Sequence, residues 1–172
     1  MSVKIAVSGA AAEAVDRVVP QLVSDLVASR ITGGDETLWG PDAEEESAKR
    51  LGWVEAVSVS RPMVADIVAL RDKLREDGVD HIVLGGMGGS SLAPEVITRT
   101  YGVELTVLDS TDPGQVLAAL GDRLATTAVV ISSKSGSTVE TDSQKRIYEK
   151  FFSEAGIDPL ERIIVVTDPG SP

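Results

Sequence analysis

The sequence contains no cysteine and only one histidine, His81, among its 172 residues. Without cysteine the chain can form no disulfide, no thiolate metal site and no cysteine nucleophile. One histidine cannot build a zinc site alone, so we expect no metal centre. No apolar run approaches the roughly 18 residues of a membrane-spanning helix, so we expect no membrane partner.

Positive charge is also scarce, because 16 Lys and Arg residues stand against 27 Asp and Glu residues and give a formal net charge of −11. Such a chain is repelled by nucleic-acid backbones and anionic membrane surfaces, and we expect neither as a partner. A small anion is not excluded, since local donors decide its binding. Residues 1–7 lack the basic and apolar regions of a signal peptide, so we expect a soluble cytoplasmic protein.

The apolar residues that are present are mostly Val, Ile, Leu and Ala, a composition typical of a parallel sheet buried under helices. Residues 1–77 read as a mainly helical segment that we expect to pack on the core. Apolar residues recur at helical spacing over 15–27, with a kink or break expected at Pro20. A short helix is expected to start at Asp42, and a clearer one lies within 60–78.

Residues 78–172 alternate between short strand-like runs and candidate helices. The runs are rich in β-branched residues, are bounded by Gly, Ser, Asp or Pro, and lie at 81–84, 105–108, 128–131 and 163–166. The candidate helices lie at 92–100, 115–124 and 138–152. This alternation predicts a three-layer α/β/α sandwich with a parallel sheet of the flavodoxin-like type. Right-handed crossovers then place the carboxyl ends of all strands on one edge, where ligands bind.

The first strand runs into a glycine-rich turn followed by two serines. Gly86, Gly88 and Gly89 let the backbone turn sharply and expose its amides to a ligand. Ser90 and Ser91 stand at the start of a helix, where orphan amides and the helix dipole favour an anion. A tight strand-to-helix turn with a serine cap explains the same pattern equally well.

The third strand runs into residues 132–138, S-S-K-S-G-S-T, with five hydroxyl residues and a lysine in seven positions. Ser137 and Glu140 have the spacing of a capping box, so helix initiation explains one hydroxyl. The surplus hydroxyls suit the several acceptor oxygens of a phosphate. Because both serine-rich loops follow strands that end on a common edge, we expect them to form one phosphate site.

The other turns have simpler explanations. Asp109 ends the second strand, but a turn that leads through Pro113 into a helix explains this segment. Residues 167–171 form another turn after the fourth strand. His81 precedes a strand, at the edge away from the ligand loops, and we interpret it as structural.

A dinucleotide-binding oxidoreductase is a competing interpretation of the first loop. Gly86-Met87-Gly88 begins like the G-x-G-x-x-G fingerprint, and Asp109 ends the next strand at a suitable distance. Against it, the third glycine position is Ser91, and the serine-rich loop after the third strand would have no task. We therefore expect no nicotinamide cofactor.

At these two loops the sequence resembles the sugar isomerase (SIS) family, and within it the glucose-6-phosphate isomerase branch. Residues 86–94, G-M-G-G-S-S-L-A-P, resemble the G-I-G-G-S-x-L-G-P motif, and residues 133–141, S-K-S-G-S-T-V-E-T, resemble the S-K-T-F-T-T-x-E-T segment. The departures are Met87, Ala93, Ser135 and Gly136. The S-x-S-G-x-T form is closer to the wider family, as in fructose-6-phosphate-using amidotransferases, whereas Lys134 and the pair Glu140 and Thr141 favour the isomerase branch.

The resemblance covers residues 79–168 and implies roles for the matching positions. The residues implied to bind the substrate phosphate are Ser90, Ser133, Ser135 and Thr138. Lys134 and Glu140 are implied to lie beside the sugar as supporting catalytic residues. The implied reaction interconverts glucose 6-phosphate and fructose 6-phosphate in glycolysis and gluconeogenesis, through a cis-enediol and without any cofactor.

The resemblance also implies groups that lie beyond Pro172: a glutamate base, a ring-opening histidine and an arginine that steadies the enediolate. The chain stops directly after its fourth strand, so we expect a piece of a longer protein with a truncated SIS-type domain over 78–172. We expect little activity from this piece alone and a homodimer in the full-length protein. A non-catalytic sugar-phosphate sensor of the same fold is the alternative function.

Overall fold

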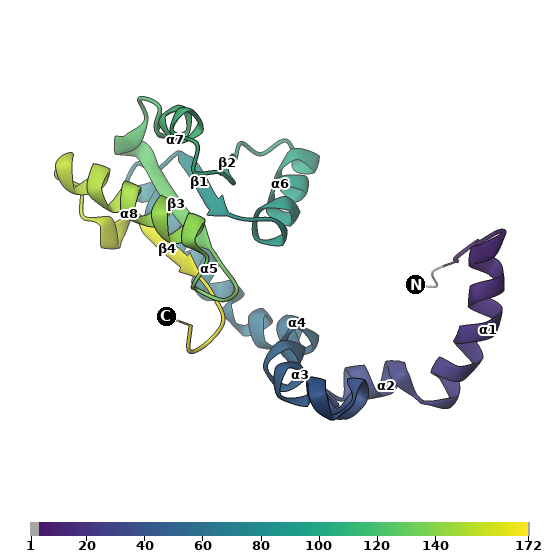
Figure 1. The fold of residues 1–172 in the computed structure, drawn as a ribbon. Helices are drawn as coiled ribbons and strands as arrows, with labels where there is room; N and C mark the ends of the chain where they lie inside the picture. Colours follow the sequence, from purple (N-terminus) through teal and green to yellow (C-terminus); the bar gives the residue numbers. More distant parts are fainter. Residues whose placement is uncertain (1–3, 172) are drawn as a thin grey trace. The chain divides into compact units, whose positions relative to one another are not determined.

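A computed structural model describes residues 4–171, whose contacts divide the chain into two compact units with the boundary between Ile67 and Val68 (Figure 1). The described part of the first unit is helical. Its elements are α1 (Ala10–Ser24), α2 (Val27–Thr32), η1 (Glu36–Trp39), η2 (Pro41–Ala43), α3 (Glu44–Arg50), η3 (Leu51–Glu55), α4 (Ala56–Ser60), η4 (Arg61–Met63) and the first residues of α5 (Val64–Glu76).

Of the kink or break expected at Pro20, the break is wrong. Helix α1 continues through Pro20, and the turn that follows is held by the Asp25 amide, which donates to the Gln21 carbonyl at 2.9 Å. The chain leaves the helix only at Leu26, whose φ of 54° is left-handed. Proline has no backbone N–H and so removes one hydrogen bond from the helix. The hydrogen bonds of the neighbouring residues keep the helix continuous at this position.

The second unit contains strands and helices in alternation. After α5 its elements are β1 (His81–Gly86), α6 (Gly89–Tyr101), β2 (Thr106–Leu108), α7 (Pro113–Leu120), η5 (Leu124–Thr126), β3 (Thr127–Ser132), α8 (Val139–Glu154), η6 (Pro159–Glu161) and β4 (Ile163–Val166). All pairings are parallel and the strand order is β2-β1-β3-β4. The predicted α/β fold with a parallel sheet is confirmed.

The two faces of the sheet are covered by different helices. On one face Val83, Val129 and Ile131 pack in a buried cluster with side chains of α7 and α8, including Tyr148 and Phe152. On the other face Ala128 packs with Leu74 of α5 and with Val79. Side chains alternate between the faces along each strand, so these clusters form the two apolar interfaces of a three-layer sandwich.

The register of the strands determines which loops are neighbours. Gly86 at the end of β1 pairs with Ser132 at the end of β3, and Gly85 pairs with Leu108 at the end of β2. The loops that follow these three strands therefore leave the sheet at one edge. The helix predicted at 115–124 is shorter than expected, because the chain turns at Gly121 with a φ of 50°.

His81 lies at the opposite end of the sheet, where it joins three strands. Its Nδ1 lies 2.9 Å from Thr127 Oγ1 and its Nε2 lies 2.7 Å from Thr106 Oγ1. Because the Thr127 hydroxyl donates to the Arg123 carbonyl, it accepts from Nδ1–H, and in the neutral ring Nε2 then accepts from the Thr106 hydroxyl. The ring is structural, and burial, followed by the nearby Arg123 charge, lowers the pKa of His81 below its ordinary 6.5 and favours the neutral form.

This environment predicts a pH-dependent stability. With the pKa of His81 lower in the folded chain than in the unfolded chain, the unfolded chain binds more protons below pH 6.5. The contribution is complete above the unfolded pKa and is lost as the pH falls through the folded pKa. Urea unfolding between about pH 5 and pH 7.5 measures the step, and His81→Gln is expected to flatten it. An unchanged step in that variant would contradict this assignment.

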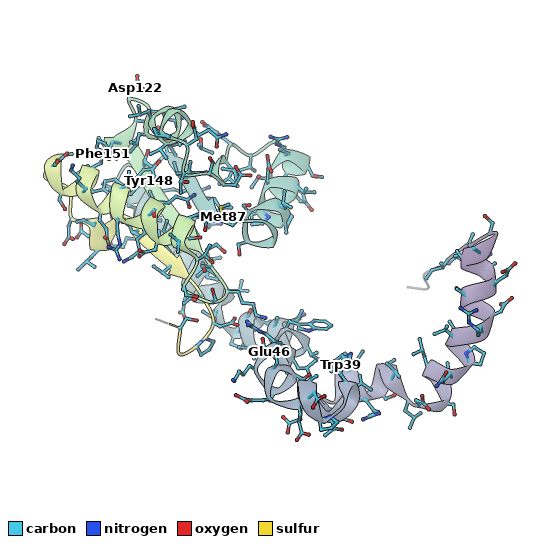
Figure 2. The ribbon with its side chains drawn as sticks, in the orientation of Figure 1. Trp39, Glu46, Met87, Asp122, Tyr148 and Phe151 are labelled. Atoms are coloured by element: carbon cyan, nitrogen blue, oxygen red, sulfur yellow. The ribbon has the colours of Figure 1, made fainter. Side chains whose placement is uncertain are left out.

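Helix α8 buries an unusual row of polar side chains against the sheet. Thr141, Gln144 and Tyr148 are at most 2% exposed, and each has a buried oxygen without a hydrogen-bond partner among the described residues. Tyr148, labelled in Figure 2, packs against Phe152 with ring centroids 6.0 Å apart. Burial raises the pKa of the Tyr148 hydroxyl to about 12, so it stays protonated.

Removal of the Tyr148 hydroxyl is expected to preserve or increase stability. A buried, unpartnered hydroxyl carries a desolvation cost, so Tyr148→Phe is predicted to raise the free energy of unfolding by up to about 1 kcal/mol. Chemical denaturation of the two proteins measures the difference. A loss of more than about 1 kcal/mol would mean that the hydroxyl has a partner in solution.

Candidate functional site

The first candidate loop begins where β1 and β3 end side by side. A side chain on Gly86 would come within 3.1 Å of the Ser132 carbonyl oxygen and within 3.3 Å of Ser90 Cβ. Ser90 therefore lies close to the point at which the second candidate loop leaves β3. The absence of a side chain at Gly86 is what allows this approach.

Helix α6 begins at this loop without a side-chain cap. Its N-cap residue is Gly88, with a φ of 55°, and no side chain accepts from the first-turn amides. Ser91 is buried and its hydroxyl donates to the Gly88 carbonyl at 3.1 Å, so this serine holds the turn together. The hydroxyl of Ser90 forms no hydrogen bond within residues 4–171 and remains available to a ligand.

The hydroxyls of the second loop are arranged in two pairs. Ser133 Oγ donates to Thr138 Oγ1 at 3.1 Å, and Ser135 Oγ accepts from both the amide and the hydroxyl of Ser137, at 3.3 and 3.1 Å. Thr138 and Ser135 thus act as acceptors within the loop. Each still has its own hydroxyl proton to donate, and these two protons are what an anion would require.

Helix α8 also starts without a cap, which corrects the capping box expected from Ser137 and Glu140. The N-cap residue is Thr138, and its side chain bonds to Ser133 instead of to the first-turn amides. The contrast with α7 is direct, because there Asp112 caps the helix by accepting from the Gln115 amide at 3.0 Å. Of these three helix starts at one edge, the two that follow serine-rich loops lack a side-chain cap, but they differ in their amides. In α6 the amides of Ser90 and Ser91 donate to the Met87 and Gly88 carbonyls, whereas the first-turn amides of α8 have no such partner among the described residues and are open to an anion.

The turn after β4 fixes the backbone of the second loop. The Lys134 carbonyl accepts from the amide of Asp168 at 3.2 Å and from the hydroxyls of Thr167 and Ser171 at 3.4 and 3.3 Å. This turn was expected from the sequence, but its role as a support was not. Three donors on one carbonyl hold the loop in shape while the side chain of Lys134 is exposed.

The charged side chains near the second loop are not all available. Within residues 4–171, Lys134 and Glu140 form no ion pair, whereas Asp142 in the first turn of α8 is paired with Arg146 at 2.8 Å. Lys134 is exposed and Glu140 is half-buried. A cation and a carboxylate therefore remain free next to the hydroxyl loop.

A cavity of about 530 Å³ lies on the β4 side of the second loop. Its walls include Ser133, Ser137, Thr141 and Lys145, over a floor that contains Ile131 and Val165. No residue of the first loop lines it. The cavity thus flanks the second loop alone.

Among residues 4–171, no group of three or more His, Asp and Glu side chains could hold a metal ion. No helix in the same part of the chain is long and apolar enough to cross a membrane.

The sequence analysis missed one residue at this edge. Gln144 of α8 is fully buried, and its Nε2 donates to the Ser110 carbonyl, 34 positions away, at 3.0 Å. The signal in the sequence is weak, because a glutamine one turn into a helix of mixed polarity is usually solvated.

Comparisons with known proteins show which proteins this chain is similar to. No family model matches the chain. A protein named glucose-6-phosphate isomerase from Cyanothece sp. is 38% identical over 98 residues, which is 52% of this chain and 18% of that protein. A probable glucose-6-phosphate isomerase from Haloarcula marismortui is 34% identical over 97 residues, or 54% of this chain and 22% of its own length. The chain therefore spans about a fifth of the curated relatives that it matches.

Two solved structures are similar in fold. A hypothetical protein from Thermus thermophilus superposes with a TM-score of 0.69 at 27% identity, over 92% of this chain and 36% of that one. A glucose-6-phosphate isomerase from Chlamydia trachomatis gives a TM-score of 0.57 at 24% identity, over 83% of this chain and 28% of that one, and supports the fold alone. The resemblance read from the two loops is thus confirmed, and about half of this chain is homologous to part of the glucose-6-phosphate isomerases.

Proposed function

We propose that this chain forms the phosphate-binding half of the active site of a glucose-6-phosphate isomerase. The observation that supports the proposal is the pair of uncapped helix starts, at α6 and α8, beside hydroxyls whose protons are not used within the fold. A phosphate ester supplies the acceptor oxygens that such donors lack, and the helix dipoles favour its charge. The names of the relatives are consistent with an isomerase.

In this proposal the phosphate binds the hydroxyls and amides of both loops. The donors are Ser90, Ser135 and Thr138, with the backbone of Gly86, Gly88 and Gly89. Ser133 joins them when its hydroxyl exchanges its bond to Thr138 for one to the phosphate. Lys134 and Glu140 lie beside the sugar, where a free cation and a free carboxylate stabilise charge and orient hydroxyls. The proposed reaction is the interconversion of glucose 6-phosphate and fructose 6-phosphate in a cytoplasmic homodimer.

The general base and the ring-opening group belong to parts of such an enzyme outside this chain. A proton-transfer enzyme without its positioned base loses roughly 10²–10⁴-fold in rate, so this chain alone is expected to bind and to turn over little. The one histidine does not supply the function, because both of its ring nitrogens are bonded at the far end of the sheet. The second candidate function is a sugar-phosphate sensor without catalysis, and the lack of an available histidine in the described residues favours it. Measured turnover by the longer protein distinguishes the enzyme from the sensor.

The double variant Ser135→Ala, Thr138→Ala tests the phosphate site. It removes two charge-assisted hydrogen bonds, so the dissociation constant of glucose 6-phosphate is expected to rise by about tenfold or more, and KM to rise likewise in the longer enzyme. Binding is measured by a ¹H–¹⁵N NMR titration of the chain.

Ser153→Ala is the matched control. Ser153 also lies on α8, but its hydroxyl donates to the Glu149 carbonyl of the same helix at 2.7 Å, near the opposite end. The control is expected to bind like the wild type. If the wild type, the double variant and the control bind glucose 6-phosphate with equal affinity, the loop over residues 132–138 is not part of the phosphate site.

A further inference from the structure

Gln144 connects two of the loops at the ligand edge. It comes from α8, which follows the hydroxyl loop, and its Nε2 donates to the Ser110 carbonyl in the loop after β2. A carbonyl can only accept, so the orientation of the amide is determined by this bond. Gln144 is fully buried, and its Oε1 has no partner among the described residues.

Gly85 allows this connection to cross β1. In the strand order β2-β1-β3-β4, β1 separates the strand before Ser110 from the strand before α8. A side chain on Gly85 would come within 2.9 Å of Gln144 Oε1 and 3.0 Å of Ile131 Cδ1. The glutamine therefore passes over β1 at a position where the strand has no side chain.

Asp109 is the exposed neighbour of the carbonyl that Gln144 holds. It follows Leu108, the last residue of β2, which pairs with Gly85 one position before the end of β1. The loop after β2 is two strand spacings, or about 10 Å, from the hydroxyl loop after β3. That separation is comparable to the length of a hexose phosphate whose phosphate lies on the hydroxyl loop.

We infer that Gln144 is a positioning residue that holds the loop after β2 so that Asp109 contacts the sugar hydroxyls of the bound hexose phosphate. The inference rests on the proposed function and adds a specificity determinant to it. A carboxylate accepts hydrogen bonds from neutral hydroxyls and repels a dianion. Asp109 thus directs the phosphate toward the hydroxyl loop and disfavours a second phosphate at the far end of the sugar.

The arrangement also accounts for the buried amide. A glutamine without exposure costs desolvation free energy, and one of its two polar atoms is unpaired here. A residue kept only for packing would be apolar, as are most members of the core cluster to which α7 and α8 contribute. The single bond that it makes joins two segments that no backbone hydrogen bond joins among residues 4–171.

Gln144→Met keeps the length and burial of the side chain and removes the donor. NMR titrations with glucose 6-phosphate and with inorganic phosphate are expected to show an affinity loss of about three- to tenfold for the sugar phosphate and less than about twofold for inorganic phosphate. Tyr148→Phe is the matched control, since it changes a buried polar atom one turn further along α8. It is expected to leave the affinity ratio unchanged. Equal losses for both ligands, or no loss, would overturn the role of Gln144.

Asp109→Asn supplies a second test in which the fold is not at risk, because the side chain is exposed. It is expected to raise the affinity for fructose 1,6-bisphosphate several-fold and to change that for inorganic phosphate little. An unchanged affinity for the bisphosphate would overturn the role of Asp109. A wild-type chain that binds neither inorganic phosphate nor glucose 6-phosphate would instead overturn the proposed function itself.

Discussion

The parallel pairing of β1 with β2 on one side and β3 on the other is the constraint on which the site depends. It brings Gly86 beside Ser132 and Gly85 beside Leu108, so three loops leave the sheet at one level. The last two residues of β1, Gly85 and Gly86, have no room for a side chain. A side chain on Gly86 would meet Ser90, and one on Gly85 would meet Gln144. Gly85 and Gly86 thus allow neighbouring segments to pack closely against the end of β1, in addition to the flexibility that glycine gives a turn.

The helix starts at this edge show a division between stability and function. Asp112 gives α7 a side-chain cap, which is typically worth about 1 kcal/mol. Helices α6 and α8 go without one although serines and a threonine stand at their starts. At α8 the hydroxyls bond to each other and the first-turn amides stay open, whereas at α6 the Ser91 hydroxyl and the Ser90 and Ser91 amides donate to backbone carbonyls. In the proposed function, a bound anion would take the place of the missing side-chain cap at these helix starts.

Much of this architecture could be predicted from the sequence, since it rests on local patterns. The four β-branched runs became the four strands, and the serine-rich loops follow β1 and β3, because strand periodicity and glycine content are local signals. The exceptions have non-local causes. Thr138 replaced Ser137 as the N-cap residue because Ser133, five positions earlier, bonds its hydroxyl. Gln144 could not be found because its partner lies 34 positions away. The helix continued through Pro20 although the residue alone predicts an interruption.

The support of the Lys134 carbonyl has a consequence for biosynthesis. Its three donors follow β4, and two of them are hydroxyls located 33 and 37 positions after the lysine. A nascent polypeptide emerges from the ribosome in order, so β1, β2 and β3 can associate before these donors have been synthesised. During that interval the Lys134 carbonyl lacks these three donors, and the hydroxyls of residues 132–138 are free to rearrange. The loop proposed to bind phosphate therefore gains this support only after the last strand has been synthesised.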